Sequence, residues 1–223
     1  MCGLASRTGK KVMKKNNFAQ LRQWMVEEQL LSRDIADPKV IKAMSKVPRQ
    51  EFVPQNLRRY AYRDSPLLIG FGQTISQPYI VALMCQFLEL KGNEKVLDVG
   101  TGLGYQAAVL GLLAKKVISI ERIRKLAESA KKTLKKLDFN NVKIVIGDGS
   151  KGVPDEAPFD AIICAAATSK IPKLWKEQLK EGGRVVLPLE KNLSQYLVRI
   201  TKKGKQFLRE TFCPVAFVPL ISC

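Results

Sequence analysis

Apolar residues near the amino end of the chain recur at helical spacing. They predict a helix over residues 18–31, and a second, short helix that begins at Pro38 and ends before Pro48. Residues 48–77 are rich in proline and glycine and predict an irregular segment. Because connections of this length usually carry function, we expect this segment to border a site.

From residue 78 onward, short apolar runs are separated by amphipathic stretches. Helices are predicted over residues 78–90, 105–113, 122–137 and 172–179, and strands over 95–99, 117–120, 142–146, 159–165 and 184–187. This alternation predicts an α/β fold with a doubly wound, mostly parallel sheet covered on both faces. Three final runs, 195–201, 206–212 and 215–220, leave no room for helices and predict an antiparallel edge.

The length of 223 residues fits one such domain. We expect a basic, disordered tail over residues 1–17 and a single domain over 18–223, with a helical covering segment at 18–77 and the α/β core at 78–223. Met13 opens the sequence MKKNNF directly before the first predicted helix. A natural start at Met13 is therefore a further hypothesis.

Composition excludes several kinds of chemistry. The chain has no histidine, which removes histidine general bases, serine–histidine and cysteine–histidine pairs and histidine metal ligands. Its five cysteines are scattered without disulfide or zinc spacing, which favours a reducing cytoplasm and no metal site. Cys85 and Cys164 lie in apolar runs, where we expect them to pack as core residues.

The net charge of +18 favours non-specific attraction to nucleic acid or to anionic membranes, without naming a partner. We interpret one group of lysines as the solvated face of a helix because no aromatic residues are interleaved with them for base stacking: Lys125, Lys131, Lys132, Lys135 and Lys136. No uninterrupted apolar run reaches the roughly 18 residues that could span a bilayer. We therefore expect no membrane partner.

The most informative stretch is VLDVGTGLGY at residues 96–105, a predicted strand that enters a glycine loop and then a helix. Gly100 and Gly102 allow a tight turn and close approach of a ligand to the backbone. The third glycine of a dinucleotide fingerprint is absent, and no Gly-Lys-Ser/Thr follows as in a phosphate loop. Alternate glycines directly after Asp98 instead resemble motif I of class I methyltransferases, and we expect Asp98, Gly100 and Gly102 to bind the cofactor.

Two later strand ends complete a candidate nucleoside site. Glu121 follows the second strand about 20 residues after the glycine loop, where a carboxylate can accept both ribose hydroxyls. Asp148 and Gly149 follow the third strand, where the aspartate could accept an adenine amino group. Glu121 could instead serve only to favour the dipole of the next helix.

With these residues placed, the chain resembles the protein-L-isoaspartate O-methyltransferase family over residues 18–220. The resemblance rests chiefly on GFGQTISQPY at residues 70–79, on the segments around Pro48 and Pro54, and on FVPL at residues 217–220. It implies a Rossmann-like class I methyltransferase fold, S-adenosyl-L-methionine as methyl donor and S-adenosyl-L-homocysteine as product. It also implies that the acceptors are isoaspartyl residues of damaged proteins, and we expect a monomer.

The resemblance further implies that Ser76 is the active-site serine, which holds the isoaspartyl carboxylate, and that Thr74, Ile75, Ser76 and Tyr79 border the donor. Ser76 and Thr74 could also simply cap the helix that begins at Pro78. Residues 165–172 depart from the family pattern and leave the acceptor wall open. Lys170 in this segment is a candidate for attracting an acidic substrate.

Carboxyl methylation suits a chain without histidine, since a carboxylate with a pKa near 4 is already ionised at neutral pH and needs no general base. The alternative enzyme, an RNA or DNA methyltransferase, predicts an Asn/Asp-Pro-Pro-Tyr/Phe loop after the fourth strand, where the chain reads Ala-Ala-Ala-Thr. A basic binding module that has lost catalysis is the non-enzymatic alternative.

Overall fold

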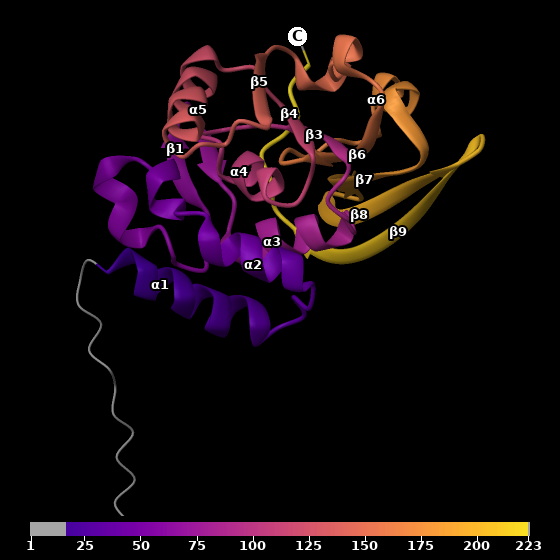
Figure 1. Cartoon of the computed structure of the whole chain (residues 1–223). Helices are drawn as coiled ribbons and strands as arrows, with labels where there is room; N and C mark the ends of the chain where they lie inside the picture. The colour runs from indigo at the N-terminus through magenta and orange to yellow at the C-terminus, as the bar shows by residue number, and fades with distance from the viewer. Residues whose placement is uncertain (1–16, 223) are drawn as a thin grey trace, which may run out of the picture.

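The computed structural model describes residues 17–222, and the predicted α/β class is confirmed. The predictions of a basic tail and of a start at Met13 lie outside the described residues, apart from Asn17. A seven-stranded sheet forms the centre of the molecule, and the helical amino-terminal segment packs along one side of it (Figure 1).

The sheet has the strand order β5-β4-β3-β6-β7-β8-β9. Its strands are β3 (Lys95–Val99), β4 (Lys116–Glu121), β5 (Val142–Ile146), β6 (Phe159–Cys164), β7 (Leu179–Lys191), β8 (Ser194–Lys203) and β9 (Gln206–Val215). The five strands β3 to β7 pair in parallel, whereas β8 pairs antiparallel with β7 and β9 pairs antiparallel with β8. The predicted antiparallel edge is therefore present, and β8 and β9 project as a long ribbon at that end of the sheet (Figure 1).

The α-helices are α1 (Phe18–Met25), α2 (Pro38–Lys46), α3 (Pro78–Phe87), α4 (Tyr105–Gly111), α5 (Arg124–Lys136) and α6 (Lys173–Gln178), and α1 continues as the π-helical turn η1 (Val26–Leu31). Three of the α-helices, α1, α2 and α3, begin at a side-chain cap or a proline. The side chain of Asn17 accepts a hydrogen bond from the first turn of α1, and Asp37 does the same for α2. Pro78 occupies the first position of α3, where its missing N–H costs nothing.

Two expectations require correction. Residues 48–77 are more regular than predicted, because they form the 3₁₀ turns η2 (Arg49–Phe52) and η3 (Gln55–Tyr60) and the hairpin of β1 (Leu67–Gly70) and β2 (Gln73–Ile75). The predicted strand at 215–220 is wrong: after β9 the chain leaves the sheet. Pro219 has no N–H to donate to a ladder, and the bonds of this segment are isolated ones. Phe217 exchanges two hydrogen bonds with the side chain of Gln195, whereas the N–H of Ala167 donates to Val218 and its carbonyl accepts from Leu220.

Strand β7 is also longer than predicted at both ends, because Gly182 and Gly183 do not interrupt it. The pairing of β7 with β6 shifts register over this stretch, between Phe159 and Ala161 on β6. The glycines therefore mark an irregularity inside a strand rather than its start.

Alternate residues of β3 face two hydrophobic clusters, one on each side of the sheet. Val96 joins the cluster that contains residues of α3, α4 and α5, whereas Leu97 joins the one that contains Trp175 of α6. Met44 and Phe52 of the amino-terminal segment belong to the first cluster. This segment therefore shares a core with the sheet and is fixed against it.

Two further expectations, one about exposed residues and one about buried residues, are confirmed. The five lysines of α5 named above are exposed, and Cys85 and Cys164 are buried and free. Among residues 17–222, no helix is long and apolar enough to cross a membrane.

Candidate active site

The glycine loop joins β3 to α4 at the carboxyl ends of the central strands. Gly100 and Gly102 have φ values of 91° and 55°, which L side chains rarely adopt. A Cβ atom at Gly100 would lie 3.6 Å from the Cβ of Ala165, so glycine keeps this side of the loop open. The N–H of Gly100 donates to the carbonyl of Ile120 at 3.0 Å, which ties the loop to β4.

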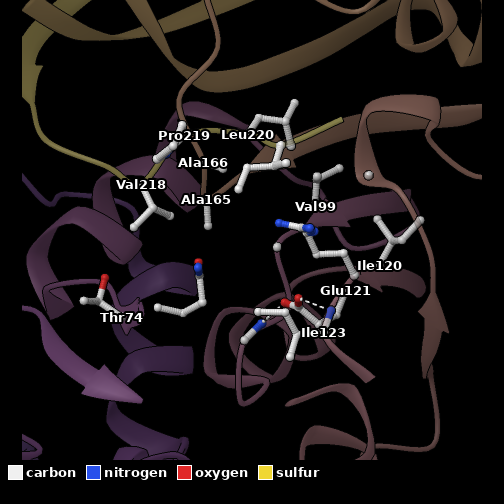
Figure 2. A pocket seen from close by; sticks show the side chains of 16 residues that line it. Thr74, Val99, Ile120, Glu121, Ile123, Ala165, Ala166, Val218, Pro219 and Leu220 are labelled. Atoms are coloured by element: carbon white, nitrogen blue, oxygen red, sulfur yellow. Dashed lines mark hydrogen bonds between the residues drawn. The ribbon is translucent and has the colours of Figure 1, made fainter. Parts of the chain in front are cut away.

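Glu121, at the end of β4, faces this loop with a fixed carboxylate. Its Oε2 accepts from the N–H of Gly102 and its Oε1 from the N–H of Ile123, both at 2.9 Å (Figure 2). Each oxygen keeps acceptor capacity for a second donor. The carboxylate is thus oriented by backbone groups and can still accept hydroxyls of a ligand.

These elements line a hollow of about 640 Å³, its open mouth included. Figure 2 shows Val218, Pro219 and Leu220 on the side opposite Glu121 and Ile123. The complete lining is Gln73, Thr74, Val99, Gly100, Gly102, Ile120, Glu121, Arg122, Ile123, Gly149, Ala165, Ala166, Val218, Pro219, Leu220 and Ile221. We call it the donor cleft.

Gly149 forms part of the donor cleft, and the neighbouring Asp148 shapes the same turn. Asp148 Oδ1 accepts from the N–H and the hydroxyl of Ser150, at 2.9 and 2.7 Å. A Cβ atom at Gly149 would lie 2.5 Å from Val99 Cγ1, so only glycine fits there without a shift. Trp175 Nε1, on α6, donates to the carbonyl of Gly149 at 2.9 Å and holds the turn in place.

Asp98 lies behind the loop, fully buried, and is not among the residues that line the donor cleft. Its carboxylate accepts from Gln106 Nε2 at 2.8 Å and from Ser119 Oγ at 2.6 Å. Burial raises the pKa of Asp98 to about 6, against the hydrogen bonds from Ser119 and Gln106, which lower it. Asp98 therefore joins β3, α4 and β4 beneath the loop.

A second hollow, the acceptor hollow, opens beside Ser76. It is lined by Pro66, Thr74, Ser76, Gln77, Ile80, Ala165, Pro214, Val215, Ala216, Phe217 and Val218. Thr74, Ala165 and Val218 also line the donor cleft. Ser76 and the buried Ile75 further line a small inner hollow that reaches Gly100 and Gly102. The structure thus brings Thr74, Ile75 and Ser76 together with the glycine loop.

Two predicted residues lie elsewhere. Tyr79 is in none of these hollows, and its hydroxyl donates to Asp34 at 2.7 Å. Burial, followed by the hydrogen bond to Asp34, raises the pKa of Tyr79 to about 12. Lys170 lines a separate hollow with Lys151 and Lys173, and so does not face Ser76.

Sequence reasoning missed two contributors to the site. Ala165 borders all three hollows, yet an alanine after a strand carries no functional signal. Arg49 is fully buried and donates to the carbonyl of Ser76 at 2.7 Å. The 3₁₀ turn that places it, η2, was predicted as irregular chain. Among the described residues, no group of three or more histidine, cysteine or acidic side chains could hold a metal ion.

Comparison with known proteins agrees with this geometry. Residues 20–223 match the family model of protein-L-isoaspartate(D-aspartate) O-methyltransferase. The protein-L-isoaspartate O-methyltransferase 1 of Syntrophobacter fumaroxidans is 52% identical over 206 residues, which cover 92% of this chain and 96% of that protein. The enzyme of the same name from Dictyoglomus thermophilum is 52% identical over 86% of this chain and 88% of its own.

Two solved structures extend the likeness to three dimensions. A protein-L-isoaspartate O-methyltransferase, 31% identical, superposes with a TM-score of 0.79 over 91% of this chain and 65% of that longer chain. A Plasmodium falciparum protein described as a protein-L-isoaspartate O-methyltransferase, in complex with S-adenosyl-L-homocysteine, is 27% identical, with a TM-score of 0.78 over 90% and 98% of the two chains. On the family match and the relatives together, this chain belongs to the protein-L-isoaspartate(D-aspartate) O-methyltransferase family.

Proposed function

We propose that the chain transfers a methyl group from S-adenosyl-L-methionine to the free carboxylate of L-isoaspartyl residues in damaged proteins. The observation that carries this proposal is the shared wall of the two hollows, formed by Thr74, Ala165 and Val218. A donor in one hollow and a carboxylate held by Ser76 in the other would meet at this wall. Family membership supports the same acceptor.

The donor cleft fits an adenosine-containing donor. Glu121 can accept the ribose hydroxyls because backbone N–H groups already orient both of its oxygens. Gly100 and Gly102 let the backbone approach the ligand, and Gly149 with Asp148 would border the adenine. When bound, S-adenosyl-L-methionine supplies a methyl group activated by a positively charged sulfur. In this proposal Asp98 supports the loop from behind.

The reaction requires little acid–base catalysis from the protein. The acceptor carboxylate, with a pKa near 4, is ionised at neutral pH and is itself the nucleophile. Ser76 donates its hydroxyl to this carboxylate, and the segment around Val218 and Leu220 holds the peptide backbone. Alignment of the reacting groups at about 3–3.5 Å is then the main catalytic contribution.

The backbone amide nitrogen should then attack the methyl ester, which closes to a succinimide with loss of methanol and without further help, and water should reopen the ring in part to normal aspartate. The test is to incubate an isoaspartyl peptide with the protein and donor and to follow both products by chromatography. The proposal expects succinimide, then normal aspartyl peptide, only when donor is present. Unchanged isoaspartyl peptide in the complete mixture would refute it.

Further features of the protein belong to the same proposal. We infer that the protein acts as a monomer in the cytoplasm, where its free cysteines would stay reduced, and that residues 18–77 cover the acceptor side of the α/β core. The exposed lysines of α5 would contact nucleic acid only non-specifically. A nucleic-acid methyltransferase is not favoured, because the relatives named above are described as protein-L-isoaspartate O-methyltransferases.

A further inference from the structure

Arg49 is a fully buried arginine without an acidic partner. Its side chain is 0% exposed, and no carboxylate among residues 17–222 forms a salt bridge with it. Buried charges in proteins are normally paired, because desolvation of an isolated ion is costly. An unpaired buried guanidinium next to a binding site therefore requires an explanation.

Two of the contacts of Arg49 are with residues that line the inner hollow, Ser76 and Tyr105. Its Nε donates to the carbonyl of Ala61 and one terminal nitrogen donates to the carbonyl of Ser76, both at 2.7 Å. The guanidinium lies over the ring of Tyr105, 4.6 Å from its centroid. Tyr105 and Ser76 both line the inner hollow, so Arg49 lies directly behind its wall.

The remaining terminal nitrogen, Nη1, has no hydrogen-bond acceptor among the described residues. Burial lowers the pKa of Arg49, and interactions with Tyr105 and Tyr62 offset part of that effect. Arginine nevertheless stays protonated in proteins. A positive charge without a counter-charge among the described residues therefore lies directly behind the wall of the inner hollow.

We propose that Arg49 is a positioning residue for the acceptor, which fixes the carbonyl of Ser76 and supplies the buried positive charge that selects an anionic carboxylate there. The proposal rests on the proposed function, since the acceptor carboxylate is the missing counter-charge. It also gives the surface lysines no role in this selection. They are exposed and screened by salt, whereas Arg49 is shielded from salt by burial.

The test compares two peptides that differ only at the acceptor, one with an isoaspartyl carboxylate and one with the corresponding carboxamide. Their affinities are measured by calorimetry on the full chain in the presence of S-adenosyl-L-homocysteine. Arg49→Gln removes the charge and keeps a hydrogen-bond donor, whereas Arg49→Lys keeps the charge. Because a purely structural role would weaken both peptides alike, the ratio of the two affinities isolates the charge.

The wild type should prefer the carboxylate, and Arg49→Gln should reduce this preference about tenfold, as expected for a unit charge acting through roughly 10 Å at an effective dielectric constant of about 20. Arg49→Lys should retain most of it. An equal preference in Arg49→Gln and wild type would overturn the proposal.

The wild type alone provides a second test that does not depend on the folding of a variant. Its preference for the carboxylate should persist between about 0.05 M and about 0.5 M salt, because a buried charge is screened far less than an exposed one. A preference lost at high salt would assign the selection to surface lysines and contradict the proposal.

Methyl transfer to the isoaspartyl peptide is assayed in parallel. If methyl transfer occurs but Arg49→Gln leaves the preference for the carboxylate unchanged, only this inference is refuted. If no methyl transfer occurs, the proposed function itself is refuted.

Discussion

At the scale of single residues, the account depends most on Ser76. Replacing it with alanine removes a hydroxyl donor to the acceptor carboxylate, a bond worth about 1.5–3 kcal/mol when one partner is charged. We therefore expect Ser76→Ala to lower kcat/KM for an isoaspartyl peptide about tenfold to hundredfold, while calorimetry shows unchanged donor affinity. Ser45→Ala, on α2 and outside the three hollows, is the matched control. Full turnover by Ser76→Ala would refute the role of this serine.

Gly149 tests the shape of the donor cleft. Its Cβ would meet Val99 Cγ1 at 2.5 Å, whereas a Cβ at Gly147 would make an ordinary contact of 3.5 Å with Ile120. Gly149→Ala should lower the free energy of unfolding by about 1–3 kcal/mol, as overpacking does, and weaken donor binding. Gly147→Ala should do neither. Thermal unfolding and calorimetry check both variants, and equal behaviour of the two would contradict the packing argument.

At the scale of secondary-structure elements, Asp98 joins β3, β4 and α4. Ser119 donates to it and also lies 2.6 Å from the hydroxyl of Thr101, so three elements meet at one buried carboxylate. Its pKa is raised from 3.8 to about 6. The folded protein therefore binds more protons here than the unfolded chain between these values, and stability falls as pH rises through this window.

Asp98→Asn removes this titration. The free energy of unfolding of the wild type, measured relative to Asp98→Asn by urea denaturation, should decrease by about 2 kcal/mol between pH 4 and pH 7, since each unit of pKa shift is worth about 1.4 kcal/mol and part of the effect lies below pH 4. A difference between the two proteins that does not vary with pH would mean that Asp98 is ionised throughout.

Glu156 connects the amino ends of the central strands. Its carboxylate pairs with Lys143 at 2.8 Å, Lys116 at 2.9 Å and Lys95 at 3.1 Å, and these lysines, Lys143 first, lower the pKa of Glu156 to about 2. Its stabilising contribution is complete above about pH 4.5 and disappears as pH falls toward 2.

We expect Glu156→Gln to reduce the free energy of unfolding at neutral pH by about 1 kcal/mol, discounted for solvent screening, and by less at high salt. Glu177→Gln, which breaks an exposed pair with Lys173 at 3.7 Å, is the control and should change stability little. Denaturation curves at low and high salt compare the two. An equal loss of stability in both variants would mean that Glu156 contributes no more than an exposed ion pair.

At the scale of the whole molecule, the sequence predicted the α/β sheet well and its periphery poorly. Strands β3 and β5 were predicted with their observed ends, because short apolar runs bounded by polar residues and glycine define buried strands. The β1–β2 hairpin was missed because its strands are only four and three residues long and carry little alternation. The segment after β9 was misread because its apolar residues line a site instead of a sheet face.

The candidate site also contains residues that could be predicted from the sequence and residues that could not. Glu121 and the glycine loop could be found because strand ends of a doubly wound sheet converge at one edge. The burial of Asp98 and Arg49 could not be predicted from the sequence. Charged residues are almost never fully buried, and only the tertiary packing reveals the exceptions. Lys170 lines a separate hollow, and this placement could not be predicted because it depends on how the segment after β6 turns.

The central claim is tested most directly by methyl transfer itself. The purified chain is mixed with tritium-labelled S-adenosyl-L-methionine and two matched peptides, one isoaspartyl and one normal aspartyl, and base-labile volatile methanol is counted. The account predicts label from the isoaspartyl peptide alone. Label from neither peptide, with donor still bound, or equal label from both, would contradict it.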